Sequence, residues 1–359
     1  MPTIWCAISG HGFGHAAQVV PVLNQLGRLV PGIVASLNTT VPASFFHDRL
    51  SIPWSLRTAE QDVGCIQNGP LDIDVPATWR ALRTFHATWE SRLNLEIAAM
   101  RAAAPDLIVA DTPYLAASAG RHAGIPTAVL ANFAWSDILP SLDDNASEHH
   151  SLLQSIEHAY AAADIGLRIA PGLPLAGVRN VVDIGAIAEP ALSQRDDLRS
   201  RLGMRPSDRL VLVGFGGIPL KNLPWDQMAD MDGFRFLVDG VLPPSSAQIS
   251  SLSALPFSFK TALASVDVLI TKPGYGTILE AVALELPVVY VRRYNFADET
   301  PLVEFLHAFG QGVELSRQDF VSGHWRPALE AVGAGRASTR RPSMAGAVEA
   351  ATILAQYFQ

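Results

Sequence analysis

Cysteine, charge and long apolar runs are scarce in this chain, and each scarcity narrows the class of protein. Cys6 and Cys65 are the only cysteines among 359 residues, which argues for reduced thiols in a cytosolic protein. Only 17% of the residues are charged and the net charge is −8, so electrostatics gives no reason to expect nucleic acid or an anionic membrane as a partner. No apolar run approaches the length of a membrane span, and the first residues lack the basic and apolar regions of a signal peptide. We therefore predict a soluble, cytoplasmic protein without an integral membrane segment.

Signatures of several cofactors are missing as well. The glycines after the first apolar run stand at positions 10, 12 and 14, which is not the G-x-G-x-x-G spacing of a dinucleotide-binding loop, and no acidic residue follows the second run. The sequence has no G-x-x-x-x-G-K-[ST] loop for a kinase or ATPase. His11 and His15 could be a metal pair or a polar helix cap, but no spaced cluster of Cys, His or acidic residues completes a metal site. We therefore expect neither a metal nor a cofactor.

What the chain does have is an alternation of short apolar runs and helical patterns from end to end. With 49% apolar residues over 359 positions, this alternation is typical of two α/β domains whose parallel sheets are covered on both faces. The expected strands cover residues 3–8, 33–37, 106–110, 126–131, 164–169, 209–217, 234–238, 267–271 and 287–291. The clearest expected helices cover residues 16–29, 76–103, 114–123, 151–163, 277–284 and 344–358.

A polar, proline-containing stretch near residues 185–192 is the expected linker between the two domains. It divides the chain into an N-terminal domain (1–187), a C-terminal domain (188–343) and a final helix (344–359), each domain with a Rossmann-like α/β pattern. The final helix is apolar and needs a surface on which to bury its side chains.

A glycine-rich turn in the second half gives the strongest functional signal. Residues 272–277 (Lys-Pro-Gly-Tyr-Gly-Thr) stand between an apolar strand and a helix, so the first N–H groups of that helix point outward at the positive end of its dipole. Gly274 and Gly276 let the backbone approach a ligand, and the arrangement indicates a phosphate site. Glu280 follows about one turn into the helix, where its carboxylate can accept hydrogen bonds from a ribose diol. An ordinary strand-to-helix turn is the plain alternative.

A second glycine-rich loop, residues 9–15, follows the first strand and ends in His15. This histidine stands at or near the first position of the next helix, where the dipole disfavours the imidazolium and favours the neutral ring that a general base needs. Asp111 ends another strand at the same edge of the sheet, where a carboxylate can orient the ring and stabilise its protonated form. We therefore predict that His15 and Asp111 form a base and its orienting partner.

In these features the chain resembles the GT-B glycosyltransferases. It is similar to the branch that contains the N-acetylglucosaminyltransferase of peptidoglycan synthesis, in which a loop histidine matches His15, a turn matches residues 274–277 and a helix glutamate matches Glu280. A further resemblance, to the N-terminal, glycosyltransferase-like half of plant L-arabinokinases, rests on residues 9–16, 132–135, 215–217, 272–277, 291–293 and 323–325. This resemblance does not extend to the kinase half of those proteins, so it does not imply phosphorylation of arabinose.

The resemblance implies a GT-B fold whose final helix crosses back to the first domain. It also implies an inverting, metal-independent transfer of a hexosyl or pentosyl group from a nucleotide-diphosphate sugar, foremost a UDP-sugar, to an acceptor hydroxyl. His15 and Asp111 would be catalytic. The donor would contact Gly216, Gly217, Lys272, Gly274, Tyr275, Gly276, Thr277, Glu280, Arg292, Asp298 and Glu299. The acceptor side of the cleft would contain His11, Gly12, Gly14, Asn132 and Trp135.

Two departures from the resembling families bear on the reaction. Retaining GT-B enzymes often have a second glutamate eight residues before the one on the phosphate helix, and here Lys272 takes that position, which favours the inverting branch. The peptidoglycan enzyme has glutamines where this chain has Asp298 and Glu299, so the donor sugar stays open. Two other functions also fit these residues: a sugar-nucleotide-binding regulatory module without chemistry, and a GT-B epimerase or hydrolase. Consumption of the donor distinguishes them, because only a transferase also needs an acceptor.

Overall fold

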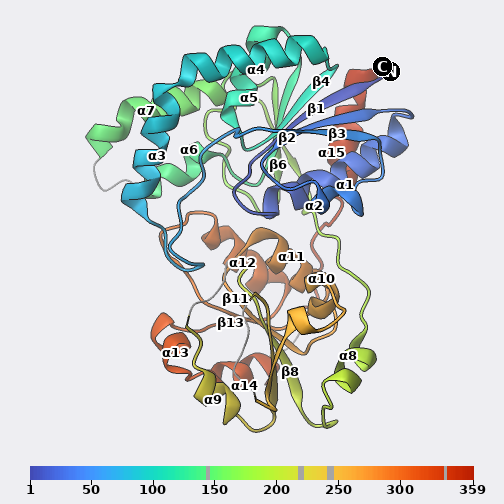
Figure 1. Ribbon diagram of the computed structural model, residues 1–359, viewed down its shortest axis with the longest axis vertical. Coiled ribbons are helices and arrows are strands. Elements are labelled where there is room, and N and C mark those ends of the chain that lie inside the picture. The colour runs from blue at the N-terminus through green and yellow to red at the C-terminus, as the bar shows by residue number, and fades with distance from the viewer. Residues whose placement is uncertain (143–145, 217–221, 241–245, 335–337) are drawn as a thin grey trace.

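Two parallel β-sheets organise the chain, as the alternation of apolar runs and helices predicts. The computed structural model describes residues 1–142, 146–216, 222–240, 246–334 and 338–359. The first sheet lies in the upper half of Figure 1 and the second in the lower half. Their strand orders are β3-β2-β1-β4-β5-β6-β7 and β10-β9-β8-β11-β12-β13, and the paired strands run parallel.

The first unit covers its sheet with helices on both faces. Its strands are β1 (Thr3–Ile8), β2 (Val34–Thr39), β3 (Trp54–Thr58), β4 (Leu107–Asp111), β5 (Thr127–Ala131), β6 (Ile165–Ile169) and β7 (Val181–Ile184). Its helices are α1 (Gly14–Leu29), α2 (Ser44–His47), α3 (Val75–Ala87), α4 (Trp89–Ala103), α5 (Tyr114–Ala123), α6 (Trp135–Ile138), η1 (Leu139–Leu142) and α7 (Ala146–Tyr160). Every residue of β4 and β5 is buried, since apolar side chains on both faces of these strands pack under helices.

The second unit repeats this plan with a smaller sheet. Its strands are β8 (Arg209–Val213), β9 (Phe234–Val238), β10 (Ile249–Ser251), β11 (Val268–Thr271), β12 (Val288–Tyr290) and β13 (Gly312–Glu314). Its helices are α8 (Arg195–Arg201), α9 (Trp225–Ala229), η2 (Leu252–Ala254), α10 (Phe259–Leu263), α11 (Tyr275–Ala283), α12 (Glu299–Phe309), α13 (Arg317–Ser322) and α14 (Arg326–Ala334). Across the described parts of both units, no helix is at once long and apolar enough to cross a bilayer.

The long helix predicted over residues 76–103 is wrong in one respect, because the structure divides it into α3 and α4. Thr88 separates them with φ −113° and ψ 19°, outside the helical region. Its hydroxyl donates to Phe85 O at 3.1 Å. A short polar side chain that bonds to the nearby backbone in this way competes with continued helix formation.

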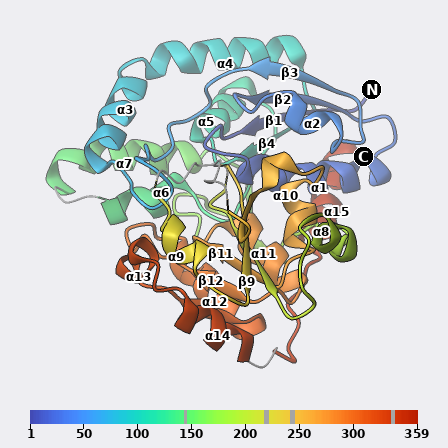
Figure 2. The same ribbon diagram turned by 60° about the horizontal axis from the view of Figure 1, so that its bottom comes forward.

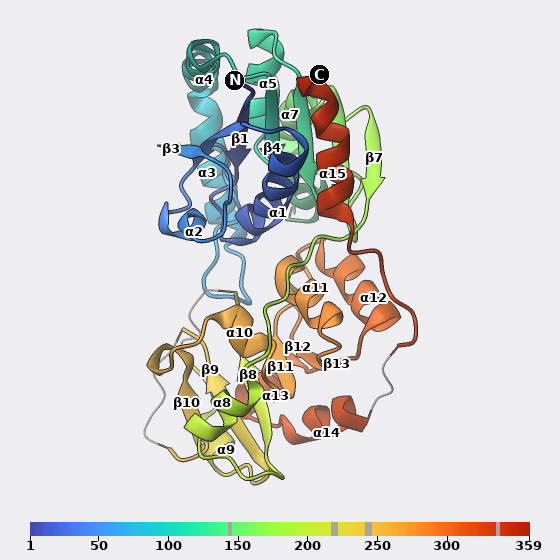
Figure 3. The same ribbon diagram turned by 90° about the vertical axis from the view of Figure 1, so that its right-hand side faces the viewer.

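The C-terminal helix crosses back to the first unit, which confirms the prediction for this part of the fold. Helix α15 (Gly346–Leu354), followed by η3 (Ala355–Phe358), packs beside α1 and β7 (Figure 3). Glu349 Oε2 accepts a hydrogen bond from Gly185 N at 2.6 Å, and Gly346 N donates to Ala186 O at 3.1 Å. The helix begins at Gly346, two residues later than predicted, and its apolar side faces the core that α1 covers.

Leu354 gives a direct test of how much this crossing stabilises the protein. The side chain is fully buried, so Leu354→Ala should lower the free energy of unfolding by about 2–5 kcal/mol, as core leucine truncations do. Val348 on the same helix is 50% exposed, and Val348→Ala should change it by less than about 0.5 kcal/mol. Urea denaturation of the two variants measures the difference. Equal midpoints would show that the docking of α15 adds no stability.

Candidate functional site

Each sheet reverses its strand order at one point, and the predicted ligand loops follow the strands at these points. In the first sheet the reversal lies between β1 and β4. The glycine loop over residues 9–14 follows β1, and β4 ends at Asp111. In the second it lies between β8 and β11, which lead into residues 214–216 and 272–274. Ligands of open α/β sheets bind outside the C-terminal strand ends at such points. Gly216 is exposed there with φ +73°, and Gly217 lies outside the described residues.

His15 and Asp111 form a direct pair at the first of these points. His15 Nδ1 lies 2.9 Å from Asp111 Oδ1. Helix α1 begins at Gly14, so His15 stands in its first turn, and β4 ends at Asp111. Asp111 is fully buried and His15 is 7% exposed. When Nδ1–H is donated to the carboxylate, Nε2 is the nitrogen left to accept a proton.

The charge balance around His15 differs from the prediction made from the helix dipole. Burial lowers the pKa of His15, but the carboxylates of Asp111, Asp62 and Asp298 raise it by more, so the net shift of the pKa is upward. The downward shift expected from the start of α1 is therefore not the net direction of the pKa shift. The partial charge at a helix end is about half a unit, whereas each neighbouring carboxylate contributes a full unit of the opposite sign.

Asp62 is a site residue that the sequence analysis missed. It lies in the connection between β3 and α3, 7% exposed, and its charge acts on His15. The stretch around it, Glu-Gln-Asp-Val-Gly-Cys over residues 60–65, has neither the periodicity of a helix nor a recognised motif. No sequence signal identifies this carboxylate, because only the fold brings the β3–α3 connection to the ends of β1 and β4.

The residues predicted for the acceptor side lie in the first unit, where the charge of His15 acts on His11. His11 Nε2 lies 3.3 Å from Gln67 Nε2, and the His11 ring meets Trp135 edge-on at 5.9 Å. Asn132 is 2% exposed and accepts a hydrogen bond from Gln18 Nε2 at 2.9 Å, while Trp135 is fully buried. Asn132 and Trp135 are thus buried, while His11 of the glycine loop packs against Trp135. The loop itself is open, since a Cβ at Gly12 or at Gly14 would meet no atom within 4 Å.

Lys272 stands at the start of α11, and no carboxylate of the described residues lies within ion-pair distance of it. Its Nζ lies 3.7 Å from where a Cβ would stand on Gly274, the residue that precedes α11. No side chain caps this end of the helix, and the position of a Cβ on Gly276 is open space. Burial, with the charge of Arg293 nearby, lowers the pKa of Lys272 to about 8. Thr277, the third residue of α11, is half-buried beside the same helix end. An ammonium group and free N–H groups at a helix start together favour an anion.

Glu280 and Tyr275, which also lie on α11, are already engaged. Glu280 is 8% exposed, and its Oε1 lies 2.7 Å from Lys260 Nζ of α10. The Tyr275 hydroxyl donates to Ala170 O at 2.7 Å and accepts from Ile187 N at 3.3 Å, so it ties α11 to the first unit. A ribose bound to Glu280 would share or replace the contact with Lys260.

The acidic residues predicted to hold the donor sugar differ in the number of hydrogen bonds that their carboxylate oxygens already accept. Glu299 is fully buried, and both its oxygens are bonded to Arg293, to Nε at 2.6 Å and to the backbone N at 2.9 Å. Asp298 is 5% exposed, and its Oδ1 has no hydrogen-bond partner among the described residues. Burial raises the pKa of Asp298 to about 7. Arg292 donates to Thr300 Oγ1 at 3.1 Å. Asp298 Oδ1 lies 4.0 Å from Arg293 Nη2, so it is ion-paired with the same arginine but accepts no hydrogen bond from a described residue.

The residues around His15 and those around the start of α11 meet at the junction between the two units. There α10 and α11 face α1 and α2 (Figure 2). Phe133 of the first unit meets Phe296 of the second edge-on at 6.1 Å. The Asp298 carboxylate is close enough to raise the pKa of His15, and the Lys272 charge contributes, after burial and His15, to lowering the pKa of His11 to about 4. His11 and His15 of the first unit thus lie within electrostatic reach of Lys272 and Asp298 of the second.

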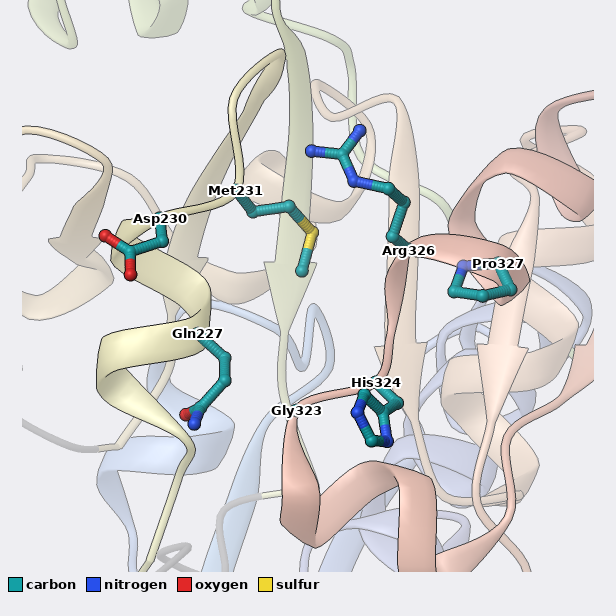
Figure 4. Close-up of a pocket in the computed structure, with 7 residues that line it drawn as sticks. All are labelled: Gln227, Asp230, Met231, Gly323, His324, Arg326 and Pro327. Carbon is teal, nitrogen blue, oxygen red and sulfur yellow. The ribbon is translucent and has the colours of Figure 1, made fainter.

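Among the described residues, no metal cluster marks this junction. In the part of the chain that the structure describes, no three His, Cys, Asp or Glu side chains are grouped to hold a metal ion. A surface hollow of about 350 Å³ lies elsewhere, between α9 and the α13–α14 connection (Figure 4). It is lined by Gln227, Asp230, Met231, Gly323, His324, Arg326 and Pro327, and it shares no residue with the predicted site. Its arginine already donates to Asp232 O at 3.0 Å.

Comparison with known proteins agrees with this architecture. No protein-family model matches the chain. An L-arabinokinase of Arabidopsis thaliana is 28% identical, over 98% of this chain and 34% of that protein. The chain therefore spans about a third of the length of this curated relative.

Solved glycosyltransferase structures have the same fold. Phytolacca americana UGT2, complexed with UDP-2fluoro-glucose and pterostilbene, has a TM-score of 0.65 at 15% identity over 100% of both chains. A spinosyn forosaminyltransferase has a TM-score of 0.62 at 14% identity over 99% of this chain and 94% of its own. The glycosyltransferase VinC, in complex with DTDP, has a TM-score of 0.60 at 14% identity over 99% of this chain and 95% of its own. At these identities the likeness shows the fold alone, and it confirms the predicted GT-B fold with two Rossmann-like domains.

Proposed function

We propose that this chain is an inverting, metal-independent glycosyltransferase that moves a hexosyl or pentosyl group from a UDP-sugar to an acceptor hydroxyl. The observation that carries the proposal is the pairing of two sites at one junction. On the first unit, His15 has a buried carboxylate partner. On the second, the start of α11 has no side-chain cap, and the Lys272 ammonium lies beside it, close enough for its charge to act on His11. The first arrangement suits proton abstraction and the second suits a leaving diphosphate. The predicted likeness to the peptidoglycan N-acetylglucosaminyltransferase branch stays part of the proposal through His15 and Glu280.

In the proposed reaction the acceptor oxygen attacks the anomeric carbon of the donor sugar. The new C–O bond forms as the bond between that carbon and the diphosphate oxygen breaks, and attack opposite the leaving group inverts the configuration. The acceptor proton moves to His15 Nε2, and the electron pair of the broken bond leaves on UDP. Asp111 holds the ring through Nδ1–H and stabilises the imidazolium that forms.

The leaving diphosphate would be stabilised by the chain without a metal. The N–H groups at the start of α11 and the Lys272 ammonium supply positive charge at that helix end. Asp298, whose Oδ1 accepts no hydrogen bond among the described residues, would accept one from a hydroxyl of the donor sugar. Glu299 could take the same role only if its bonds to Arg293 opened.

The proposal is tested by calorimetric titration with UDP in the presence and absence of EDTA. We expect UDP to bind and the affinity to persist in EDTA. Glu280→Ala should weaken binding by roughly 1–3 kcal/mol, the cost of leaving the ribose hydroxyls unpaired. Glu304→Ala, which changes an exposed glutamate of α12, should leave the affinity unaltered. Equal affinities for the Glu280 variant and the wild type would remove Glu280 from the site, and loss of binding in EDTA would contradict a metal-free donor site.

A sugar-nucleotide-binding module without chemistry is the second candidate function. The observation in its favour is that the arabinokinase relative matches along only 34% of its own length, so the matching part belongs to a larger protein. Such a module would bind UDP-sugar and consume none. An epimerase or hydrolase would consume it without an acceptor, so following the donor by chromatography separates the three.

A further inference from the structure

Asp62 is the point at which three strand-end loops converge. Its carboxylate accepts hydrogen bonds from Ser9 Oγ at 3.0 Å, from Thr112 Oγ1 at 3.2 Å and from Trp135 Nε1 at 2.6 Å. These donors follow β1, β4 and β5, the three neighbouring strands beneath the predicted site. One buried side chain thus connects the loop that leads to His15 with the end of the strand that carries Asp111.

The backbone next to Asp111 depends on this connection. Thr112 has φ +59°, a left-handed conformation that is rare and strained for a β-branched residue. Its hydroxyl is held by Asp62, and its carbonyl accepts a hydrogen bond from Tyr160 Oη at 2.6 Å. On the other side, Ser9 N donates to Asp111 O at 3.0 Å. The bonds to Asp62 therefore hold Thr112, which follows Asp111, and Ser9, which is hydrogen-bonded to Asp111 and begins the loop that leads to His15.

Burial raises the pKa of Asp62, and the nearby charge of His15 acts in the opposite direction. No Lys or Arg of the described residues lies within 4.0 Å of its carboxylate, and its hydrogen-bond donors are neutral. The titratable groups that face Asp62 are His15, Asp111, Tyr114 and Tyr160. Those that face His15 are Asp111 from β4, Asp62 from the β3–α3 connection, Asp298 from the start of α12 and His11 from the glycine loop. Protonation of His15 is thus the event that neutralises part of this buried negative charge.

We propose that Asp62 is a positioning residue for the His15–Asp111 pair: it fixes the loops on both sides of the pair and supplies a second negative charge that stabilises the His15 imidazolium. This inference rests on the proposed function, in which His15 takes the acceptor proton. It assigns Asp62 no contact with the substrate.

The test is a pH titration of the His15 ring nitrogens by NMR in the wild type and in Asp62→Asn. The amide fits the same place, because its oxygen can accept from Trp135 and Thr112 while its NH2 group donates to Ser9 Oγ. We expect the midpoint of the His15 titration to move to lower pH in Asp62→Asn, because a negative charge that favours the imidazolium has been removed. UDP affinity should stay within about twofold, because Asp62 belongs to the opposite side of the junction. The His15 signals are identified by their loss in His15→Asn.

Asp137→Asn is the matched control. Asp137 is also a hydrogen-bonded carboxylate of the first unit, accepting from the backbone N–H groups of Ala134, Leu175 and Ala176, but it is not one of the carboxylates that chiefly raise the pKa of His15. Its removal should leave the His15 midpoint in place. An unchanged midpoint in Asp62→Asn, or an equal shift in both variants, would overturn the inference.

The test also covers a variant that does not fold and a wild type that does not bind UDP. If Asp62→Asn does not fold, the test is made on the wild type. The NMR signal of the Asp62 carboxyl carbon should then show an inflection at the pH of the His15 midpoint. The absence of that inflection would overturn the inference. If the wild type fails to bind UDP, the proposed function fails. The His15 titration still stands in that case, so the two failures are distinguishable.

Discussion

Replacing His15 by alanine is expected to lower sugar transfer by about 10²- to 10⁴-fold, the contribution that a positioned general base typically makes. UDP affinity should stay within a few-fold of the wild type, because the His15 ring lies in the first unit and its interaction with the acceptor strengthens mainly in the transition state. Initial rates of UDP release with a transferable acceptor, together with calorimetry of UDP, measure the two effects separately.

His122→Ala is the control for this experiment. His122 is an exposed histidine at the end of α5, and its Nδ1 bonds to Ser118 O at 2.8 Å within its own helix. It should leave both transfer and UDP binding unaltered. Full activity in His15→Ala would remove His15 from the chemistry, and the non-catalytic binding module would then become the better account of the site.

Replacing Lys272 by methionine is expected to weaken UDP binding by about 10- to 100-fold. The estimate follows from the loss of a charge-assisted hydrogen bond to a phosphate, which contributes about 1.5–3 kcal/mol. Methionine keeps the length of the side chain and removes only the ammonium group. Calorimetric titration of the variant with UDP measures the loss.

Uridine serves as the matched ligand for the Lys272 experiment. It lacks the diphosphate, so Lys272→Met should bind uridine as the wild type does, and Lys272→Arg should recover part of the UDP affinity through its retained charge. Equal loss of UDP and uridine would indicate a general disturbance of α11 and its neighbours. Unchanged UDP affinity would place the diphosphate away from this helix.

How far the sequence predicts the fold depends on where each strand lies in its sheet. The nine predicted strands are the inner strands β1, β2, β4, β5, β6, β8, β9, β11 and β12. The missed strands are β3, β7, β10 and β13, which are the four edges of the two sheets. An inner strand of a parallel sheet is buried on both faces, so it has a continuous run of apolar residues in the sequence. An edge strand is more exposed: no residue of β3 is fully buried, so its residues do not differ enough from those of a loop.

The candidate site divides in a similar way. The sequence by itself determined the two glycine turns, the histidine that follows one and the lysine within the other, because each is a local pattern at the end of an apolar run. It also placed Asp111 beside His15, since the C-terminal ends of parallel strands share one edge of a sheet. Only the tertiary structure brought Asp62 under the pair and Lys260 against Glu280. It also reversed the expected pKa shift of His15. Contacts between distant segments depend on how the connections fold over the sheet edge, and the sum of the charges that meet there is not contained in any local stretch of residues.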